Sequence, residues 1–291
     1  MTVFPEVSPV YTVYFYTEFL YKVVKFKRAA SGVLPQPSEE APSERFSQSY
    51  SRSRRVVLQC ALCNQWDYFV TITVSPEKFD RYTLKPIWDA LYDFFRFYRD
   101  TYNSGFKYLL VPELHEDNAW HFHGFLSGIL PQHVSAFVPG IHPQKLIDKG
   151  YVNFGLLADV VGFVSMGELR NDTAASFYVV KYITKEHAHD DLYDHLYYRS
   201  QGLKMAFPVS DCYCYNSSLE ACISWEGDFC ATGWARLSSP DFTFPLSLDG
   251  CEPRLEEVFA PAAIEEEIEN LNNTFYFVQL LPPAKPPPPD A

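Results

Sequence analysis

The chain has 291 residues, of which 47% are hydrophobic and 17% aromatic; this composition supports a sizeable core and excludes disorder throughout. The net charge of −12 is concentrated at one end: residues 211–291 contain 14 acidic and three basic residues, whereas residues 1–210 contain 22 and 21. The acidity therefore argues against a nucleic-acid partner only for the C-terminal region.

The sequence shows no sign of a membrane segment or of secretion. No run of about 18 uncharged apolar residues is present, and the apolar N-terminus is interrupted by Glu6 and Glu18 and lacks a basic start. The seven cysteines are an odd number without the spacing of a disulfide framework, which indicates a reducing compartment. We therefore expect a cytoplasmic protein without a membrane partner.

An N-terminal extension is predicted over residues 1–59. Its beginning predicts one or two strands, and residues 29–53, which are rich in Ser, Pro and charge, predict a linker or a long loop. Basic clusters occur at residues 22–28 and 52–55. Residues 1–210 have nearly equal numbers of acidic and basic residues, so these clusters could present a local positive charge to a nucleic acid.

A densely patterned globular domain is predicted over residues 60–204. Its expected elements are a strand at 68–74, a helix at 86–102, strands at 107–114 and 120–127 joined by a polar turn, a strand at 160–169 and a helix at 173–187. The helix at 86–102 carries one apolar stripe, formed by Ile87, Leu91, Phe94, Phe95 and Tyr98. This order favours an α+β fold, in which a central antiparallel sheet has helices packed mainly on one face.

An acidic C-terminal region is predicted over residues 205–291. It contains a candidate helix at 261–273 and a proline-rich tail at 282–291. Two interpretations stay open for this region: a regulatory or partner-binding module, or a solvated segment without a dedicated role. The composition favours the second.

The cysteines allow two interpretations as well. Cys60 and Cys63 form one CxxC pair, and a loose second cluster consists of Cys212, Cys214, Cys222 and Cys230. Structural zinc sites show two tight pairs. The spacing of the second cluster therefore favours buried free thiols over a zinc site.

His121 and His123 are separated by one apolar residue, Phe122, within a predicted strand. Strand side chains alternate, so both imidazoles project from one face while Phe122 packs into the core. A symmetric turn would place Glu113 opposite His121 as the third ligand of one ion, and His115, nearer the turn, is a rival ligand. Imidazole pairs suit Zn, Mn, Fe or Ni, and the added carboxylate brings in Mg²⁺ or Mn²⁺.

Tyr178 and Tyr182 are four residues apart and share one face of the predicted helix. Lys181 and Lys185 would be costly in a core, so they place a cationic edge beside the tyrosines. A divalent cation or a lysine nearby favours the phenolate, which makes either tyrosine a candidate nucleophile. Tyr182 is favoured for the first attack because both lysines flank it. An ordinary core helix also shows Tyr, Val and Ile at this spacing.

Several enzyme classes lack support. The chain contains no GxxxxGK[ST], no HExxH and no GxSxG, so helicase, zinc-protease and α/β-hydrolase activities are not indicated. By contrast, the segments YFVTITV, WHFHGFL and YVVKYITK, in this order, resemble the HUH endonucleases that initiate rolling-circle replication. The resemblance is greatest to the initiators of microviruses, including gokushovirus-like phages, and of related plasmids and prophages. It covers about residues 60–204.

This resemblance implies a ferredoxin-like core, in which His121, His123 and Glu113 bind the metal and Tyr178 or Tyr182 attacks single-stranded origin DNA. The products would be a 5′-phosphotyrosine link and a free 3′-OH. Host polymerase, with a host helicase, would extend that end in the bacterial cytoplasm before the strands are rejoined. A transposase or relaxase with the same chemistry stays an alternative, as does a non-catalytic nucleic-acid-binding protein whose aromatic side chains stack bases.

Overall fold

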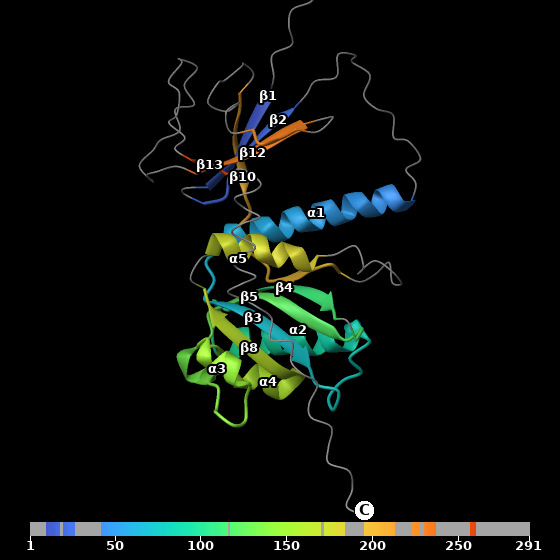
Figure 1. The fold of residues 1–291 in the computed structure, drawn as a ribbon, viewed down its shortest axis with the longest axis vertical. Helices are drawn as coiled ribbons and strands as arrows, with labels where there is room; N and C mark the ends of the chain where they lie inside the picture. Colours follow the sequence, from blue (N-terminus) through green and yellow to red (C-terminus); the bar gives the residue numbers. More distant parts are fainter. Residues whose placement is uncertain are drawn as a thin grey trace, which may run out of the picture. The chain divides into compact units, whose positions relative to one another are not determined.

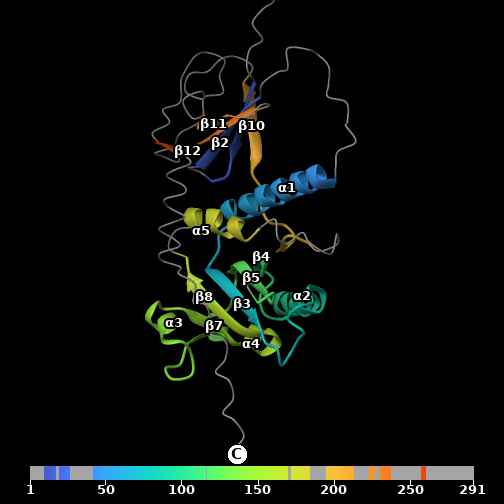
Figure 2. The same ribbon diagram turned by 45° about the vertical axis from the view of Figure 1, so that its right-hand side comes forward.

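The structure is a computed structural model (Figures 1 and 2). It describes residues 10–17, 20–26, 42–115, 117–169, 172–183, 195–212, 223–226, 230–236 and 257–259. The chain divides into two compact units. Unit 1 consists of Met1–Gln65, Asp172–Lys185 and Arg199–Glu267, and unit 2 of Trp66–Asn171, Glu186–Tyr198 and Ile268–Ala291. The boundaries expected after residues 59 and 204 stay predictions.

A seven-stranded sheet, in the order β6-β7-β8-β3-β5-β4-β9, forms the centre of unit 2. Its strands are β3 (Tyr68–Val74), β4 (Lys107–Leu114), β5 (Trp120–Ser127), β6 (Val134–Ala136), β7 (Val152–Phe154), β8 (Gly162–Glu168) and β9 (Tyr198–Arg199). Strand β3 pairs antiparallel with both β5 and β8, and β5 pairs antiparallel with β4. This antiparallel sheet with flanking helices confirms the predicted α+β fold.

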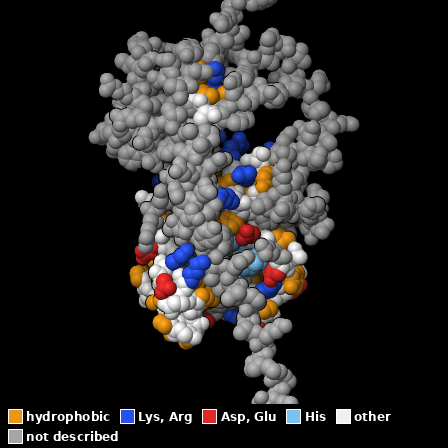
Figure 3. All heavy atoms as spheres, in the orientation of Figure 1, with side chains coloured by type: hydrophobic (Ala, Val, Ile, Leu, Met, Phe, Trp, Pro, Cys, Tyr) orange, Lys and Arg blue, Asp and Glu red, His pale blue; other side chains and the backbone are white. Residues whose placement is uncertain are grey.

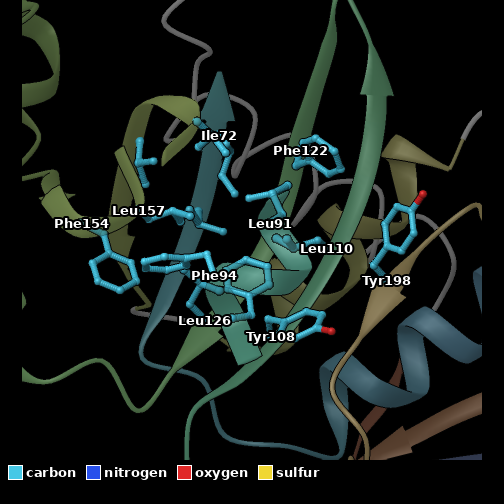
Figure 4. Close-up of a cluster of buried hydrophobic side chains, with 14 of the residues drawn as sticks. Ile72, Leu91, Phe94, Tyr108, Leu110, Phe122, Leu126, Phe154, Leu157 and Tyr198 are labelled. Atoms are coloured by element: carbon cyan, nitrogen blue, oxygen red, sulfur yellow. The ribbon is translucent and has the colours of Figure 1, made fainter. Parts of the chain in front are cut away.

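Two helices of unit 2, α2 (Leu84–Thr101) and α4 (Gly155–Val161), bury their apolar sides against one face of the sheet (Figure 4). The predicted stripe of α2 is buried in full. Each large apolar side chain removed from water contributes about 1.5–3 kcal/mol, so this layer holds the sheet in place. A short helix, α3 (Gln144–Asp148), and a 3₁₀ turn, η1 (Pro131–His133), complete the unit.

The period-2 alternation of the strands decides which side chains face these helices. On β3, Ile72 joins the helix-covered core, and on β5 Phe122 does the same. The residues beside them in the chain, Thr71 and His123, are register partners whose side chains therefore project from the opposite face. The functional candidates of unit 2 thus lie on the side of the sheet away from α2 and α4.

Unit 1 contains a six-stranded sheet in the order β10-β1-β2-β12-β11, with β13 paired to β12. Its strands are β1 (Val10–Phe15), β2 (Leu20–Phe26), β10 (Phe207–Cys212), β11 (Trp225–Glu226), β12 (Cys230–Arg236) and β13 (Glu257–Phe259). The N-terminal strands confirm the strand prediction for this stretch. Their partners β10 and β12 come from residues 205–291, the predicted acidic C-terminal region.

Helix α1 (Pro42–Leu62) contradicts part of the predicted linker. The expectation of a loop over residues 29–53 is wrong from Pro42 onward, because proline is well tolerated at the start of a helix and no Gly or Pro follows it within α1. Apolar residues of its second half, including Val57 and Ala61, are buried. Packing of this face compensates for the polar composition that predicted a loop.

The tyrosine-bearing helix is shorter than expected. Helix α5 runs from Asp172 to Val179, and a 3₁₀ turn, η2, follows over Val180–Tyr182. The prediction of a continuous α-helix is therefore wrong over residues 180–183, and residues 184–187 lie outside the described residues. Two adjacent valines disfavour the α-helix, and helices often tighten to 3₁₀ in their last turn. Figures 1 and 2 both show α1 and α5 side by side within unit 1.

Two further predictions, the helix at 261–273 and the proline-rich tail, lie outside the described residues. None of the described helices combines the length and the apolar character that a membrane-spanning segment needs.

Candidate functional site

The β4–β5 hairpin has the register that the sequence predicts. Leu114 pairs with Trp120 and Glu113 with His121. The connecting turn is closed by the Ala119 carbonyl, which accepts a hydrogen bond from the His115 N–H at 3.0 Å. Asn118 has φ of 60°, a left-handed conformation that Asn tolerates better than most residues. The turn chemistry and the strand alternation together place Glu113 and both histidines on one face.

Two threonines of β3 hold the imidazoles from the neighbouring strand. Thr71 Oγ1 lies 3.1 Å from His123 Nδ1, and Thr73 Oγ1 lies 3.4 Å from His121 Nδ1. A hydroxyl can donate to this nitrogen or accept from it, so the contact suits either tautomer. With Nδ1 engaged, the other ring nitrogen, Nε2, is the one each histidine can offer to a ligand. Sequence reasoning missed this role, although Thr-x-Thr within YFVTITV was its visible signal.

Glu113 and His123 are in direct contact. Glu113 Oε2 lies 2.7 Å from His123 Nε2, with 28% of the Glu113 side chain exposed and only 2% of that of His123. Burial alone would raise the pKa of Glu113, but the hydrogen bond from His123 and the neighbouring histidines outweigh it, and the pKa lies below its usual value. The carboxylate is therefore negatively charged at neutral pH.

His121 is neutral at neutral pH. Burial, followed by the proximity of His123 and His115, lowers its pKa to about 4. The His115 ring stacks on the His121 ring at a centroid distance of 4.9 Å, so the rival ligand also lies at this site. A neutral imidazole is the form that binds a metal ion. Figure 3 shows histidine and acidic side chains close together at the surface of unit 2.

The chemistry of these donors fits a divalent cation, since one carboxylate and two imidazoles share a strand face. Glu113 and His123 contact each other directly. Within the ranges that the structure describes, no three His, Cys, Asp or Glu side chains form a cluster that could hold a metal ion. Metal binding by Glu113, His121 and His123 accordingly belongs to the proposal below.

The second candidate cluster, on α5 and η2, belongs to unit 1. The Tyr182 hydroxyl donates to the Tyr178 hydroxyl at 2.7 Å, and the two rings meet edge to face. Both tyrosines are buried, with exposed fractions of 4% and 3%. Lys181 is exposed, and its Nζ lies 5.4 Å from the centre of the Tyr178 ring. Lys185 lies outside the described residues.

Helix α1 supports the tyrosine turn from the side. The Tyr50 hydroxyl donates to the carbonyl of Ile183, the residue after Tyr182. The Arg54 guanidinium lies over the Tyr50 ring, 5.8 Å from its centre. The sequence alone gave no reason to connect Tyr50 or Arg54 with the tyrosines, because more than 120 residues separate them.

Neither described thiol of the CxxC pair has the lowered pKa of a reactive cysteine. Cys60 and Cys63 are free thiols, and Cys60 is buried. Burial raises the pKa of Cys60, and it raises that of Cys63 to about 12. Cys214 and Cys222 lie outside the described residues. The preference for buried thiols over zinc stays a prediction.

The predicted site residues therefore form two groups. Glu113, His121 and His123 lie together on the hairpin of unit 2, and Tyr178, Tyr182 and Lys181 lie together in unit 1. In each group two of the predicted residues are in direct contact: Glu113 with His123, and Tyr178 with Tyr182. The sequence spacing is compatible with these contacts but does not show them.

Comparison with known protein families gives a match to part of the chain. The model of a family of replication-associated proteins, described under the name ORF2, matches residues 67–187 of this chain, which is 121 of its 291 residues. The matched segment begins at β3 and includes the hairpin, Glu113, both histidines and both tyrosines. This similarity supports a role in the initiation of replication. No curated protein and no solved structure matches the chain.

Proposed function

We propose that this protein is a replication initiator that nicks origin DNA through a tyrosine and later rejoins the strands. The nick leaves a 5′-phosphotyrosine link and a free 3′-OH for rolling-circle replication. The observation that supports this proposal most directly is the hairpin: Glu113 is paired in register with His121 and contacts His123, inside the segment that matches a replication-associated family.

The hairpin residues would bind the cation and hold the scissile phosphate. A Mg²⁺ or Mn²⁺ ion there would supply Lewis-acid polarisation of a phosphoryl oxygen. Glu113 provides the negative charge, and His121 provides a neutral nitrogen that does not oppose a cation. Thr71 and Thr73 orient the two rings through Nδ1. The core between the sheet and helices α2 and α4 would hold the hairpin side chains in place while the DNA strand is bound.

The tyrosine turn would supply the nucleophile. The phenolic oxygen of Tyr178 or Tyr182 attacks phosphorus, the bond to the 3′ oxygen breaks, and the released 3′ oxygen takes up a proton. The attacking phenol loses its proton to water, and a hydrogen bond from the Tyr182 hydroxyl would stabilise negative charge on the Tyr178 oxygen. Lys181 would stabilise the negative charge that develops nearby. In the joining step a 3′-OH attacks the phosphotyrosine and the phenol is restored.

The test is covalent capture. Full-length protein is mixed with single-stranded origin oligonucleotides and Mn²⁺, adducts are separated on denaturing gels, and the linked peptide is identified by mass spectrometry. We expect Tyr178→Phe and Tyr182→Phe each to leave some cleavage but to block the joining cycle, and the double variant to form no adduct. Tyr151→Phe, which alters a half-buried tyrosine of unit 2, is the matched control and should react normally.

An adduct on another residue, or one that persists in the double variant, would overturn the tyrosine assignment. Full nicking in excess chelator would overturn the cation assignment. Cleavage at mobile-element ends rather than at the replication origin of the protein's own replicon would favour the transposase or relaxase alternative. Binding of single strands without any adduct would favour the non-catalytic one. Host polymerase enters the proposal only as the user of the free 3′-OH, and a host helicase only as the enzyme that would open the duplex for it.

A further inference from the structure

Helix α1 carries a cationic face that the proposed chemistry does not use. Arg52, Arg54 and Arg55 are exposed and lie within one turn of the helix, and residues 46–62 contain no acidic residue. We call these three residues the α1 arginine face. Arg52 and Arg55, three residues apart on the helix, repel each other weakly, and a bound anion would relieve that repulsion.

A second helix of the protein provides a direct contrast. The basic residues of α2 are paired with carboxylates of the same helix: Lys85 with Asp89 at 2.6 Å, Arg96 with Asp93 at 3.5 Å and Arg99 with Asp100 at 2.9 Å. Across the described part of the chain, no ion pair involves the α1 arginine face. The two helices have similar numbers of exposed cations, but among the described residues only those of α2 are paired with carboxylates.

The position of Arg54 connects this face to the tyrosine turn. Arg54 lies over the Tyr50 ring, and the Tyr50 hydroxyl holds the carbonyl of Ile183, next to Tyr182 in the chain. Helix α1 also packs along α5 within unit 1. Two contacts therefore connect Arg54 to the tyrosine turn: its guanidinium lies over the Tyr50 ring, and the Tyr50 hydroxyl donates to the Ile183 carbonyl. Residues 52–55 precede the segment that matches the replication-associated family.

We infer that the α1 arginine face binds backbone phosphates of a single DNA strand beside the phosphate that the tyrosine attacks, an inference that rests on the proposed function. Guanidinium groups bind phosphate oxygens in pairs, with a geometry that carboxamides cannot reproduce. Lys181, exposed on the turn, adds a further cation on the same unit. The face holds the strand without reading its bases, since phosphate contacts carry no sequence information.

The experiment compares salt dependence in two matched triple variants of the full-length protein. Binding of a fluorescent oligothymidine is measured by anisotropy with chelator present, between about 50 and 200 mM salt, where each phosphate contact contributes about 0.7 to the logarithmic slope. Arg52→Gln, Arg54→Gln and Arg55→Gln together should lower the slope by about 2, the sum for three contacts. Lys85→Gln, Arg96→Gln and Arg99→Gln together remove the same charge from α2 and should leave the slope unchanged.

A wild-type slope in the α1 triple variant, or an equal loss in both triple variants, would overturn the inference. Tighter binding of an RNA strand of matching sequence would overturn the assignment to DNA. Thermal melting verifies that each variant is folded, and Arg54→Gln alone, with an expected loss of one contact, replaces the triple variant if that one fails to fold.

The binding measurement does not require cleavage, so it separates this inference from the proposed function. A reduced slope without any covalent adduct in the wild-type protein would support the arginine face and reject the nicking proposal. Normal adduct formation by the wild-type protein, together with an unchanged salt slope in the α1 triple variant, would support the nicking proposal and reject the arginine face.

Discussion

The hairpin of unit 2 and the tyrosine turn of unit 1 differ in the charge that their side chains carry. At the hairpin, Glu113 is ionised while His121 is neutral, so the cluster favours an added cation. At the tyrosine turn, two neutral phenols are accompanied by Lys181 and Arg54, which favour an added anion. A reaction at a phosphate needs both: a cation that polarises its oxygen and a cationic setting that holds the strand.

The two regions also differ in how their geometry is fixed. The hairpin is held by ladder register and by a sheet face buried under α2 and α4, so its side chains are set by backbone pairing. The tyrosine turn is held by side-chain contacts, including the Tyr50 hydroxyl on the Ile183 carbonyl. We therefore expect backbone substitutions to damage the first region and side-chain substitutions to alter the second.

The largest effect is expected at Gly124, where β4 and β5 approach most closely. A Cβ atom there would lie 1.9 Å from the Leu109 carbonyl oxygen, and a backbone atom cannot move aside. Gly124→Ala should lower the free energy of unfolding by at least about 3 kcal/mol, measured by denaturant titration. Gly155→Ala, with no atom within 4 Å of the added carbon, is the control and should change it by less than about 1 kcal/mol. Similar stability of the two variants would show that backbone approach does not fix the hairpin.

A smaller effect is expected when only the charge of the hairpin is removed. Glu113→Gln keeps the shape of the side chain but removes the carboxylate that attracts the cation. Mn²⁺ affinity, measured by calorimetry, should fall at least about 100-fold, since even residues that only support a ligand cost 10–100-fold. Glu168→Gln removes an exposed carboxylate from the end of β8 and should leave the affinity unchanged. Equal Mn²⁺ affinities of the Glu113→Gln and Glu168→Gln variants would show that the hairpin carboxylate does not attract a cation.

The smallest effect is expected at the residue that only orients a ring. Thr71→Val retains the size of the side chain but removes the hydroxyl that contacts His123 Nδ1. Mn²⁺ affinity should fall about 10-fold and the imidazole nitrogen shifts of His123 should change in metal-free protein. Thr71→Ser, which restores the hydroxyl, should recover both. Unchanged shifts and affinity in the valine variant would exclude an orienting role.

The sequence by itself determined the hairpin. Alternation of Thr71 with Ile72, and of His123 with Phe122, fixed which side chains face the helices, because a strand has only two faces. The five-residue turn then fixed Glu113 opposite His121. These relations are local, since they connect residues close in the chain or depend on one periodicity. The buried stripe of α2 followed from the helical period for the same reason.

Only the tertiary structure decided the surroundings of the tyrosines. Packing makes residues 42–53 helical where composition predicted a loop. Long-range contacts join Tyr50 to Ile183 and pair β2 with β12, across segments that share no period or motif. Such contacts depend on which apolar faces pack together in the folded chain. The free energy of burying these faces decides which of them pack together, and a local sequence pattern does not show this.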